Sequence, residues 1–536
     1  MRALPIVLVT LSMLSGLGPA LAQAPISDED LRRSQEAGGP LPISLDQALR
    51  LAIVRSYVLN QRRLDVETSG QQVRQAYGTV YPRIDGNASY TRQIDQLNPF
   101  AGSTAGAAFF GGGAAEGFLA LNPLTQDDFQ SFVGVQPITD LSDNPFFIEN
   151  RFALGLTVTQ LLYDGGAFAA IRGAQALQKQ ARALFRDQAR QTVRDVTQAY
   201  YDVVLAEAQA DVLRRSEARS EQEVADARAR VEQGTQPRFS LLTAEVQLAN
   251  IQTQRLRAEN AAATAKDQLN ILLGVPVGLQ LVLSDGLDPV DTPMNPDLEQ
   301  SVATAYAERP DLEAAALAVE LSEVERKVEF ASYLPILEAF FTAEINGQVP
   351  DERTAQGLGS TVLNPDGSFE FVEGETVSRG FFSGDFWGPN ITAGLQLRWN
   401  LFNGFETAAR VAQQKIAERR NRLAQNLLSA RIRAEVESEV RNLQTAFDQI
   451  ESQTKNVNRA ETNYEDANVR VEQGVSSQVE LRDASELLDD SRLNYLNAVR
   501  DYRVAEVQYR VAIGEPPLPD GELPEATQEG HGGEAD

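Results

Sequence analysis

The chain has 536 residues, with 48 basic and 75 acidic side chains, a formal net charge of −27, no cysteine and one histidine. The absence of cysteine excludes disulfides, zinc–cysteine sites and a thiol nucleophile, and the lone His531 argues against histidine-based catalysis. The acidic balance repels nucleic acid backbones and anionic lipid surfaces. We therefore expect neither a cofactor nor a metal site nor a nucleic acid partner.

The N-terminal segment has the pattern of a secretory signal peptide. Met1-Arg2 is followed by an apolar run over residues 3–14 and by the small-residue cleavage pattern Ala20-Leu21-Ala22. We expect a signal peptide over 1–22 and a linker over 23–43; the alternative is a buried N-terminal helix. No later stretch offers about 18 uninterrupted apolar residues, so a role in a membrane would have to come from β-strands.

The first half of the mature chain predicts long helices separated by two strands. Residues 167–233 contain no proline and one glycine, which at 1.5 Å per residue gives a rod of about 100 Å. Apolar residues in it step by four and three, as in a coiled-coil seam: Ala189, Val193, Val196, Tyr200 and Val203. The expected elements of this half (44–275) are a helix over about 47–80, strand 81–92, loop 94–150, strand 152–163, helix 167–233 and helix 237–273.

The second half repeats the first. Arg230-Val231-Glu232-Gln233-Gly234 recurs identically at 470–474, and Tyr81-Pro82 corresponds to Leu334-Pro335. A linker over 276–295 separates the copies, and an acidic tail, expected to be disordered, follows over 515–536. The expected elements of the second copy (296–514) are a helix over about 296–331, strand 335–345, loop 347–388, strand 390–402, helix 406–473 and helix 477–513.

All four strands are expected to alternate between apolar and polar residues, as in the run from Ile391 to Leu401, and to be long enough to cross an outer membrane. Trp387 and Trp399 are expected about 30 Å apart, in two aromatic girdles. Four strands are too few to close a barrel, so further copies of the chain must complete the sheet. A half-buried water-soluble sandwich is the alternative.

The two loops, 94–150 and 347–388, are rich in glycine, asparagine, aspartate and proline. Asn364-Pro365-Asp366-Gly367 predicts a turn between two short strands, 360–363 and 368–372. We expect both loops to lie outside the cell. The sequence leaves open whether they plug the mouth, meet a phage or shield the rim.

The chain resembles the TolC-type outer-membrane efflux duct family. The resemblance rests on the duplication, on Tyr81-Pro82, on Arg309-Pro310-Asp311-Leu312, and on Leu162-Tyr163-Asp164-Gly165 with its counterpart Leu401-Phe402-Asn403-Gly404. It implies a mainly α fold with a small transmembrane β part: a homotrimer whose 12-stranded β-barrel in the Gram-negative outer membrane continues into a periplasmic α-barrel of 12 helices. It also implies a periplasmic adaptor and an inner-membrane pump as partners, with solutes moving passively through the duct.

The resemblance assigns the hairpin tips to contact with the adaptor. The residues concerned are Gly234, Thr235, Gln236, Pro237, Gly474, Val475, Ser476 and Ser477. The alternative is that the glycines only cap helices.

An acidic pair follows the second tip. By resemblance, Glu480 and Asp483 line the closed periplasmic mouth, and residues three apart share one helix face, so a trimer would stack two carboxylate rings that attract cations. The alternative is an ordinary capping box between Ser477 and Glu480. At the first tip the equivalent position holds Ser240 rather than an acid, so how the closed state is held stays open.

Two other function classes are compatible with parts of this pattern. A periplasmic coiled-coil scaffold would share the long helices but not the four alternating strands. An enzyme would need an activity carried by carboxylates alone. Within the favoured class, the sequence does not distinguish drug efflux from protein secretion.

Overall fold

The computed structural model describes residues 40–94, 148–290, 292–351, 353–356, 360–365, 369–372, 375–473 and 475–516. The signal peptide, most of the first long loop, Gly474 and most of the acidic tail therefore lie outside the described residues. The chain divides into two compact units, one of helices and one around a sheet. The helical unit contains the chain up to Arg74, Ala170–Lys327 and the part from Ala409; the sheet unit contains Gln75–Ala169 and Val328–Ala408.

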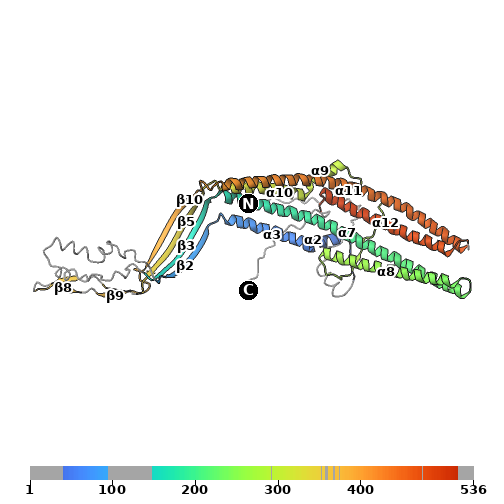
Figure 1. Cartoon of the computed structure of the whole chain (residues 1–536), viewed down its shortest axis with the longest axis horizontal. Coiled ribbons are helices and arrows are strands. Elements are labelled where there is room, and N and C mark those ends of the chain that lie inside the picture. The colour runs from blue at the N-terminus through green and yellow to red at the C-terminus, as the bar shows by residue number, and fades with distance from the viewer. Residues whose placement is uncertain are drawn as a thin grey trace, which may run out of the picture. The chain divides into compact units, whose positions relative to one another are not determined.

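The helices run as two hairpins and two pairs of shorter helices (Figure 1). The long helices α7 and α11 have 68 and 67 residues, and the return helices α8 and α12 have 36 each. The helix bounds are α2 (Leu45–Arg55), α3 (Tyr57–Gly78), α7 (Gly165–Glu232), α8 (Arg238–Leu273), α9 (Leu298–Glu308), α10 (Pro310–Ala331), α11 (Glu406–Glu472) and α12 (Gln478–Ile513).

Two of the expected helices are interrupted. The helix expected over 47–80 is α2 and α3, broken at Ser56, and the helix expected over 296–331 is α9 and α10, broken at Arg309. Arg309 precedes Pro310, whose ring disfavours helical backbone in the residue before it. Ser56 has extended backbone without a proline, so its break depends on packing.

The packing at both breaks involves the glycine that ends a return helix. Gly274 ends α8 with φ +70°, and a Cβ placed there would lie 2.3 Å from the carbonyl oxygen of Arg55. Gly514 ends α12 with φ +93°, and its Cβ would lie 2.9 Å from that of Glu308. Each return helix thus docks closely on the break between the two short helices of its own copy.

Gly274→Ala should destabilise the protein by roughly 3 kcal/mol, because alanine would meet both a left-handed backbone and a backbone clash. Gly234→Ala is the matched control: its φ is +74°, but nothing lies within 4 Å of the added Cβ, so about 1 kcal/mol is expected. The urea midpoint of the purified protein measures both. Equal midpoints for the two variants would show that the close docking adds no stability.

Contacts between side chains give the order of the helices in the helical unit. Arg186 pairs with Glu313 at 2.6 Å between α7 and α10, and Arg326 pairs with Glu418 at 3.1 Å between α10 and α11. A Cβ at Gly70 of α3 would lie 3.3 Å from the amide of Gln178 in α7. The order is therefore α3, α7, α10, α11. Further along α7, ion pairs join it to α8 on one side and to α12 on the other.

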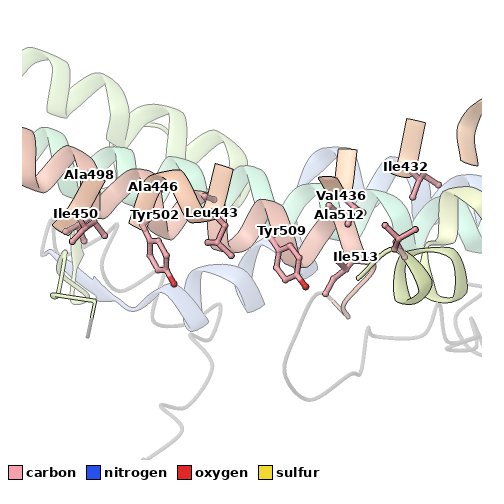
Figure 2. Packing of buried hydrophobic residues seen from close by; sticks show 14 residues of the cluster. Ile432, Val436, Leu443, Ala446, Ile450, Ala498, Tyr502, Tyr509, Ala512 and Ile513 are labelled. Atoms are coloured by element: carbon pink, nitrogen blue, oxygen red, sulfur yellow. The ribbon is translucent and has the colours of Figure 1, made fainter. Parts of the chain in front are cut away.

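Three apolar clusters hold the described part of the helical unit together, two in the first copy and one in the second. The seam predicted in α7 is buried, with Ala189, Val196, Tyr200 and Val203 all fully covered. A short parallel pair of strands, β1 (Leu41–Ile43) and β4 (Leu281–Leu283), lies beside it. The cluster of the second copy packs residues of α11 against α12, including Tyr502 and Tyr509 (Figure 2).

The sheet has four antiparallel strands in the order β10-β5-β3-β2 (Figure 1). Their bounds are β2 (Arg83–Arg92), β3 (Asn150–Tyr163), β5 (Ile336–Val349) and β10 (Trp387–Arg398). The strand expected over 390–402 thus begins three residues earlier, because residues 387–389 pair with β5. It ends four residues earlier, where Arg398 pairs with Ile336, the first residue of β5. A bulge interrupts β3 between Leu161 and Tyr163.

Two further hairpin-like pairs lie in the second long loop. β7 (Ser360–Leu363) pairs with β8 (Phe369–Val372), as the turn signal between them predicts, and β6 (Thr354–Gln356) pairs with β9 (Thr376–Ser378). Asp366 and Gly367 of the predicted turn lie outside the described residues.

Candidate functional site

The register of the sheet separates its side chains into one apolar and one polar face. Residues directly opposite one another share a face, and Ile84, Val158, Phe341 and Ala393 form one such row. Three further rows on this face contain Gly86, Ala88, Tyr90, Phe152, Leu154, Leu156, Ala343, Ile345, Gly347, Trp387, Pro389 and Ile391, and the two rows toward the end of β10 contain Tyr163, Gln160, Leu337, Ala339, Leu395 and Leu397. No charged residue stands in these rows.

The opposite face is mostly polar. Its central row consists of Asp85, Thr157, Thr342 and Thr392. Charges on this face pair with one another: Arg83 lies 2.8 Å from Asp85, and Arg398 lies 3.1 Å from Glu338. The alternation predicted from the sequence is therefore a property of the whole sheet.

The apolar face is uncovered in a single chain. Ile84 is 65% exposed, Ile391 68% and Leu395 69%, so no second layer packs on these residues within the described chain. This exposure contradicts the sandwich alternative, in which such residues would form a core.

The two tryptophans lie next to opposite ends of β10. Trp387 begins the strand in the row of Tyr90 and Phe152; the Phe152 ring lies 5.5 Å from the indole and 4.8 Å from the Tyr90 ring. Trp399 follows the last residue of the strand, and its indole N–H donates to the carbonyl of Tyr333 at 3.0 Å. Aromatic side chains thus border the apolar face at both ends.

The first hairpin tip is a tight connection between α7 and α8. Gly234 adopts φ +74°, and the N–H of Thr235 donates to the carbonyl of Arg230 at 2.9 Å. Gln236 follows in the turn, and Pro237 precedes the first residue of α8 without a side-chain cap. Phe239, the second residue of α8, is 76% exposed.

The second tip repeats this backbone geometry. The N–H of Val475 donates to the carbonyl of Arg470 at 3.0 Å, as Thr235 does to Arg230. Val475 is 71% exposed, and the hydroxyl of Ser477 accepts from the N–H of Glu480 at 3.2 Å. Gly474 lies outside the described residues.

Glu480 makes only half of the capping box that the sequence suggested. Its carboxylate accepts from the Ser476 hydroxyl and lies 3.2 Å from the Arg470 guanidinium. Asp483 lies 3.1 Å from the adjacent Arg482 and remains 63% exposed. Both carboxylates therefore have a basic partner in the same chain, and both stay accessible to solvent.

Polar contacts that no sequence pattern predicts join the two hairpins near the tips. Arg219 and Ser216 of α7 both donate to Asp489 of α12, and Gln247 of α8 donates to Glu486 at 3.0 Å. Burial raises the pKa of Glu223, which lies near Arg482. At the first tip, the backbone N–H of Ser240 donates to the carbonyl of Pro237 at 3.0 Å. The residues that make these contacts between the hairpins are 239 to 273 residues apart in sequence, so no local pattern indicates that they pair.

The described residues contain no group of three or more histidine, cysteine, aspartate or glutamate side chains that could hold a metal ion. Within the same ranges, none of the helices is both long and apolar enough to cross a membrane.

The family model described as outer membrane efflux protein matches residues 144–275 and 302–515. The chain belongs to the outer membrane efflux protein family. No curated protein matches it. The family resemblance read from the sequence is thereby confirmed, and so is the outer membrane of Gram-negative bacteria as its location. Outer membrane efflux proteins are channels, which excludes the enzyme alternative.

Solved structures of outer-membrane channels share the fold. The CmeC outer membrane channel of Campylobacter jejuni gives a TM-score of 0.65 at 15% identity over 88% of this chain and 85% of that chain. The VceC outer membrane protein of Vibrio cholerae gives 0.61 at 14% identity over 91% and 99%. The MtrE outer membrane channel of Neisseria gonorrhoeae, in its open state, gives 0.62 at 15% identity over 89% and 90%.

Proposed function

We propose that three copies of this chain form a passive exit duct for solutes that an inner-membrane pump exports through a periplasmic adaptor. The observation that carries the proposal is the four-stranded sheet with one apolar face and two open edges. In this arrangement residues 1–22 are the signal peptide, 44–275 and 296–514 are the two repeats, and 276–295 is the equatorial linker between them. The two long loops lie outside the cell.

The open edges of the sheet support its completion by strands from other copies of the chain. Within the described chain β2 and β10 each have a strand on one side only. An unpaired backbone N–H or C=O in lipid costs several kcal/mol, so an open edge cannot face the membrane interior. Pairing β10 of one copy with β2 of the next removes both edges, and three copies of a four-stranded sheet give the 12 strands expected from the family resemblance.

The helices support the same closure. α3 and α11 stand at the two ends of the helix row and carry exposed apolar side chains: Leu64 is 59% exposed, Ile416 65% and Leu423 68%. On α8 the exposed residues Phe239, Leu242, Val246 and Leu256 fall on one coiled-coil stripe, since steps of three, four and ten (seven plus three) keep them at the a and d positions of a heptad. Such stripes suit helices of neighbouring copies.

The adaptor contact is proposed at the hairpin tips. Val475 and Phe239 are exposed apolar groups beside tight turns of equal backbone geometry, which suits packing against the ends of another helical hairpin. The tip residues that would make this contact are Gly234, Thr235, Gln236, Pro237, Gly474, Val475, Ser476 and Ser477.

Glu480 and Asp483 are proposed as two rings of carboxylates at the periplasmic mouth. In planar bilayers the purified protein should form pores that prefer cations, and replacing both acids by alanine should lower that preference severalfold, because the variant loses six carboxylates per trimer. Replacing Glu465 and Asp466, two acids on the neighbouring helix α11, is the matched control and should leave the preference unchanged.

The carboxylate rings and the duct can fail independently. Equal cation preference and equal block by divalent cations in both variants would contradict the ring assignment alone. The duct itself fails if electron microscopy of the detergent-extracted protein finds monomers, or particles without a helical tunnel of about 100 Å.

A further inference from the structure

The turn between β9 and β10 contacts the end of the apolar face, where the Phe381 ring packs against Phe152. Within it, the N–H of Ser383 donates to Gly380 at 2.9 Å and the N–H of Phe386 donates to Ser383 at 3.0 Å. The indole N–H of Trp387 donates to the carbonyl of Phe381 at 2.8 Å and so fixes the turn to the start of β10.

Three rings of this region form a cluster that we name the aromatic clasp: Phe381, Phe382 and Trp387. The Phe381 ring lies 5.8 Å from the indole and packs edge-on against Phe152 at 5.4 Å, while the Phe382 ring stacks on the indole at 6.0 Å. The guanidinium of Arg353 lies 6.0 Å above the Phe381 ring. Because Phe152 and Trp387 belong to the apolar face, the clasp lies on that side of the sheet.

The clasp stands at the boundary of the apolar face. Its row, with Tyr90 and Phe152, is followed by the row of Arg92, Asn150 and Val349. In that next row the guanidinium of Arg92 pairs with Asp351 at 2.7 Å. The surface therefore changes from apolar to charged within one row, as at the edge of a lipid layer.

Phe382 is the most exposed ring of the clasp, with 84% of its surface accessible. Several polar groups around it bond within the turn: the indole N–H bonds to a carbonyl, and Asp385 lies 3.3 Å from Arg379 and accepts from the Ser383 hydroxyl at 3.0 Å. An exposed ring beside polar side chains that are bonded in this way suits the headgroup region, where water pairs the remaining backbone groups.

We propose that the aromatic clasp is a lipid anchor, in which Phe382 enters the headgroup–acyl boundary of the outer membrane and sets the depth of the sheet. Lipid is the occupant because the clasp continues the apolar face that meets the membrane. The anchor lies in a turn outside the strands. The inference rests on the proposed function, which requires that face to contact lipid.

The test uses the two tryptophans of the sequence as separate probes. In Trp399→Phe protein, Trp387 is the only indole; the protein is reconstituted into phosphatidylcholine vesicles brominated near the headgroup or near the chain ends. Trp387 should be quenched more by the shallow bromines than by the deep ones. Adding Phe382→Ser should increase quenching by aqueous acrylamide about twofold, because the covering ring is lost. Val377, on β9, is also an exposed apolar residue. Val377→Ser is therefore the matched control and should leave the acrylamide quenching of Trp387 unchanged.

Trp387→Phe protein, which retains Trp399, separates the possible failures. If Trp399 is quenched by brominated lipid and Trp387 is not, the sheet is inserted but the clasp is no lipid anchor. Protection of Trp387 from both lipid and acrylamide would mean that protein covers it, which also overturns the inference. If neither tryptophan is quenched by lipid, the proposed function itself fails.

Discussion

Ile391→Arg should prevent stable insertion of the protein into the outer membrane, whereas Thr392→Arg, one residue further along β10, should be tolerated. Ile391 stands on the apolar face between residues without charge, and Thr392 stands on the polar face opposite Thr342. An arginine on the lipid side of a membrane strand costs about 2–4 kcal/mol at mid-depth, and every copy in the assembly carries it. On the polar face the same side chain remains in contact with water.

The fraction of protein that stays in washed outer membranes measures this difference, and the urea midpoint of folding into vesicles gives its size. Both variants add the same charge to neighbouring positions of one strand, so effects on expression or net charge cancel. If both variants are lost from the washed membranes to the same extent, the two faces of the sheet meet the same environment. The assignment of the apolar face to lipid would then be wrong.

Much of the fold could be predicted because its signals are local. Long stretches without proline and glycine predict α7 and α11 within two residues of their bounds, and Gly234 marks the end of the first of them. The alternation of residues 391–397 predicts which side chains of β10 share a face. The break at Arg309 also has a local signal, since Pro310 follows it.

The rest depends on contacts between distant segments. Nothing around Ser56 predicts a helix break, because its partner is Gly274, more than 200 residues away. The start of β10 at Trp387 follows from its pairing with Gly347, over which the indole lies. The candidate site shows the same limit: the family resemblance assigns Glu480 and Asp483 to the mouth and their spacing puts them on one helix face, but no pattern predicts the contacts of Asp489 with Arg219 and Ser216.

A buried group of charges joins α7, the break between α9 and α10, and the end of α12. Arg190 of α7 is 3% exposed; it donates to the carbonyl of Val511 at the end of α12 and lies 4.0 Å from Asp187. Arg309 donates to the next carbonyl, that of Ala512, at 3.1 Å. Two guanidinium groups therefore face the negative end of the α12 helix dipole.

Arg190→Ala should lower the free energy of unfolding by about 3–5 kcal/mol, because removal of one partner leaves the half-buried Asp187 and the Val511 carbonyl without their cation. The urea midpoint of the purified protein measures the loss. Arg194→Ala, one turn further along α7, is the control: its ion pair with Asp195 is 39% and 44% exposed, so less than about 1 kcal/mol is expected.

The effect of Arg190→Ala should also depend on pH. Burial, with a contribution from Asp311, raises the pKa of Asp187, while Arg190 opposes that rise. A carboxyl whose folded pKa exceeds its unfolded value favours the fold when protonated, so its contribution falls as pH rises through the folded pKa. Without Arg190 the pKa rises further, and the loss of stability should be largest above the folded pKa of Asp187 and shrink as the pH falls below it.

Asp187→Asn in the Arg190→Ala background is the control for this pH dependence. It should restore part of the stability and remove the dependence on pH. If Arg190→Ala instead lowers the free energy of unfolding by the same amount at every pH, Arg190 acts through packing alone.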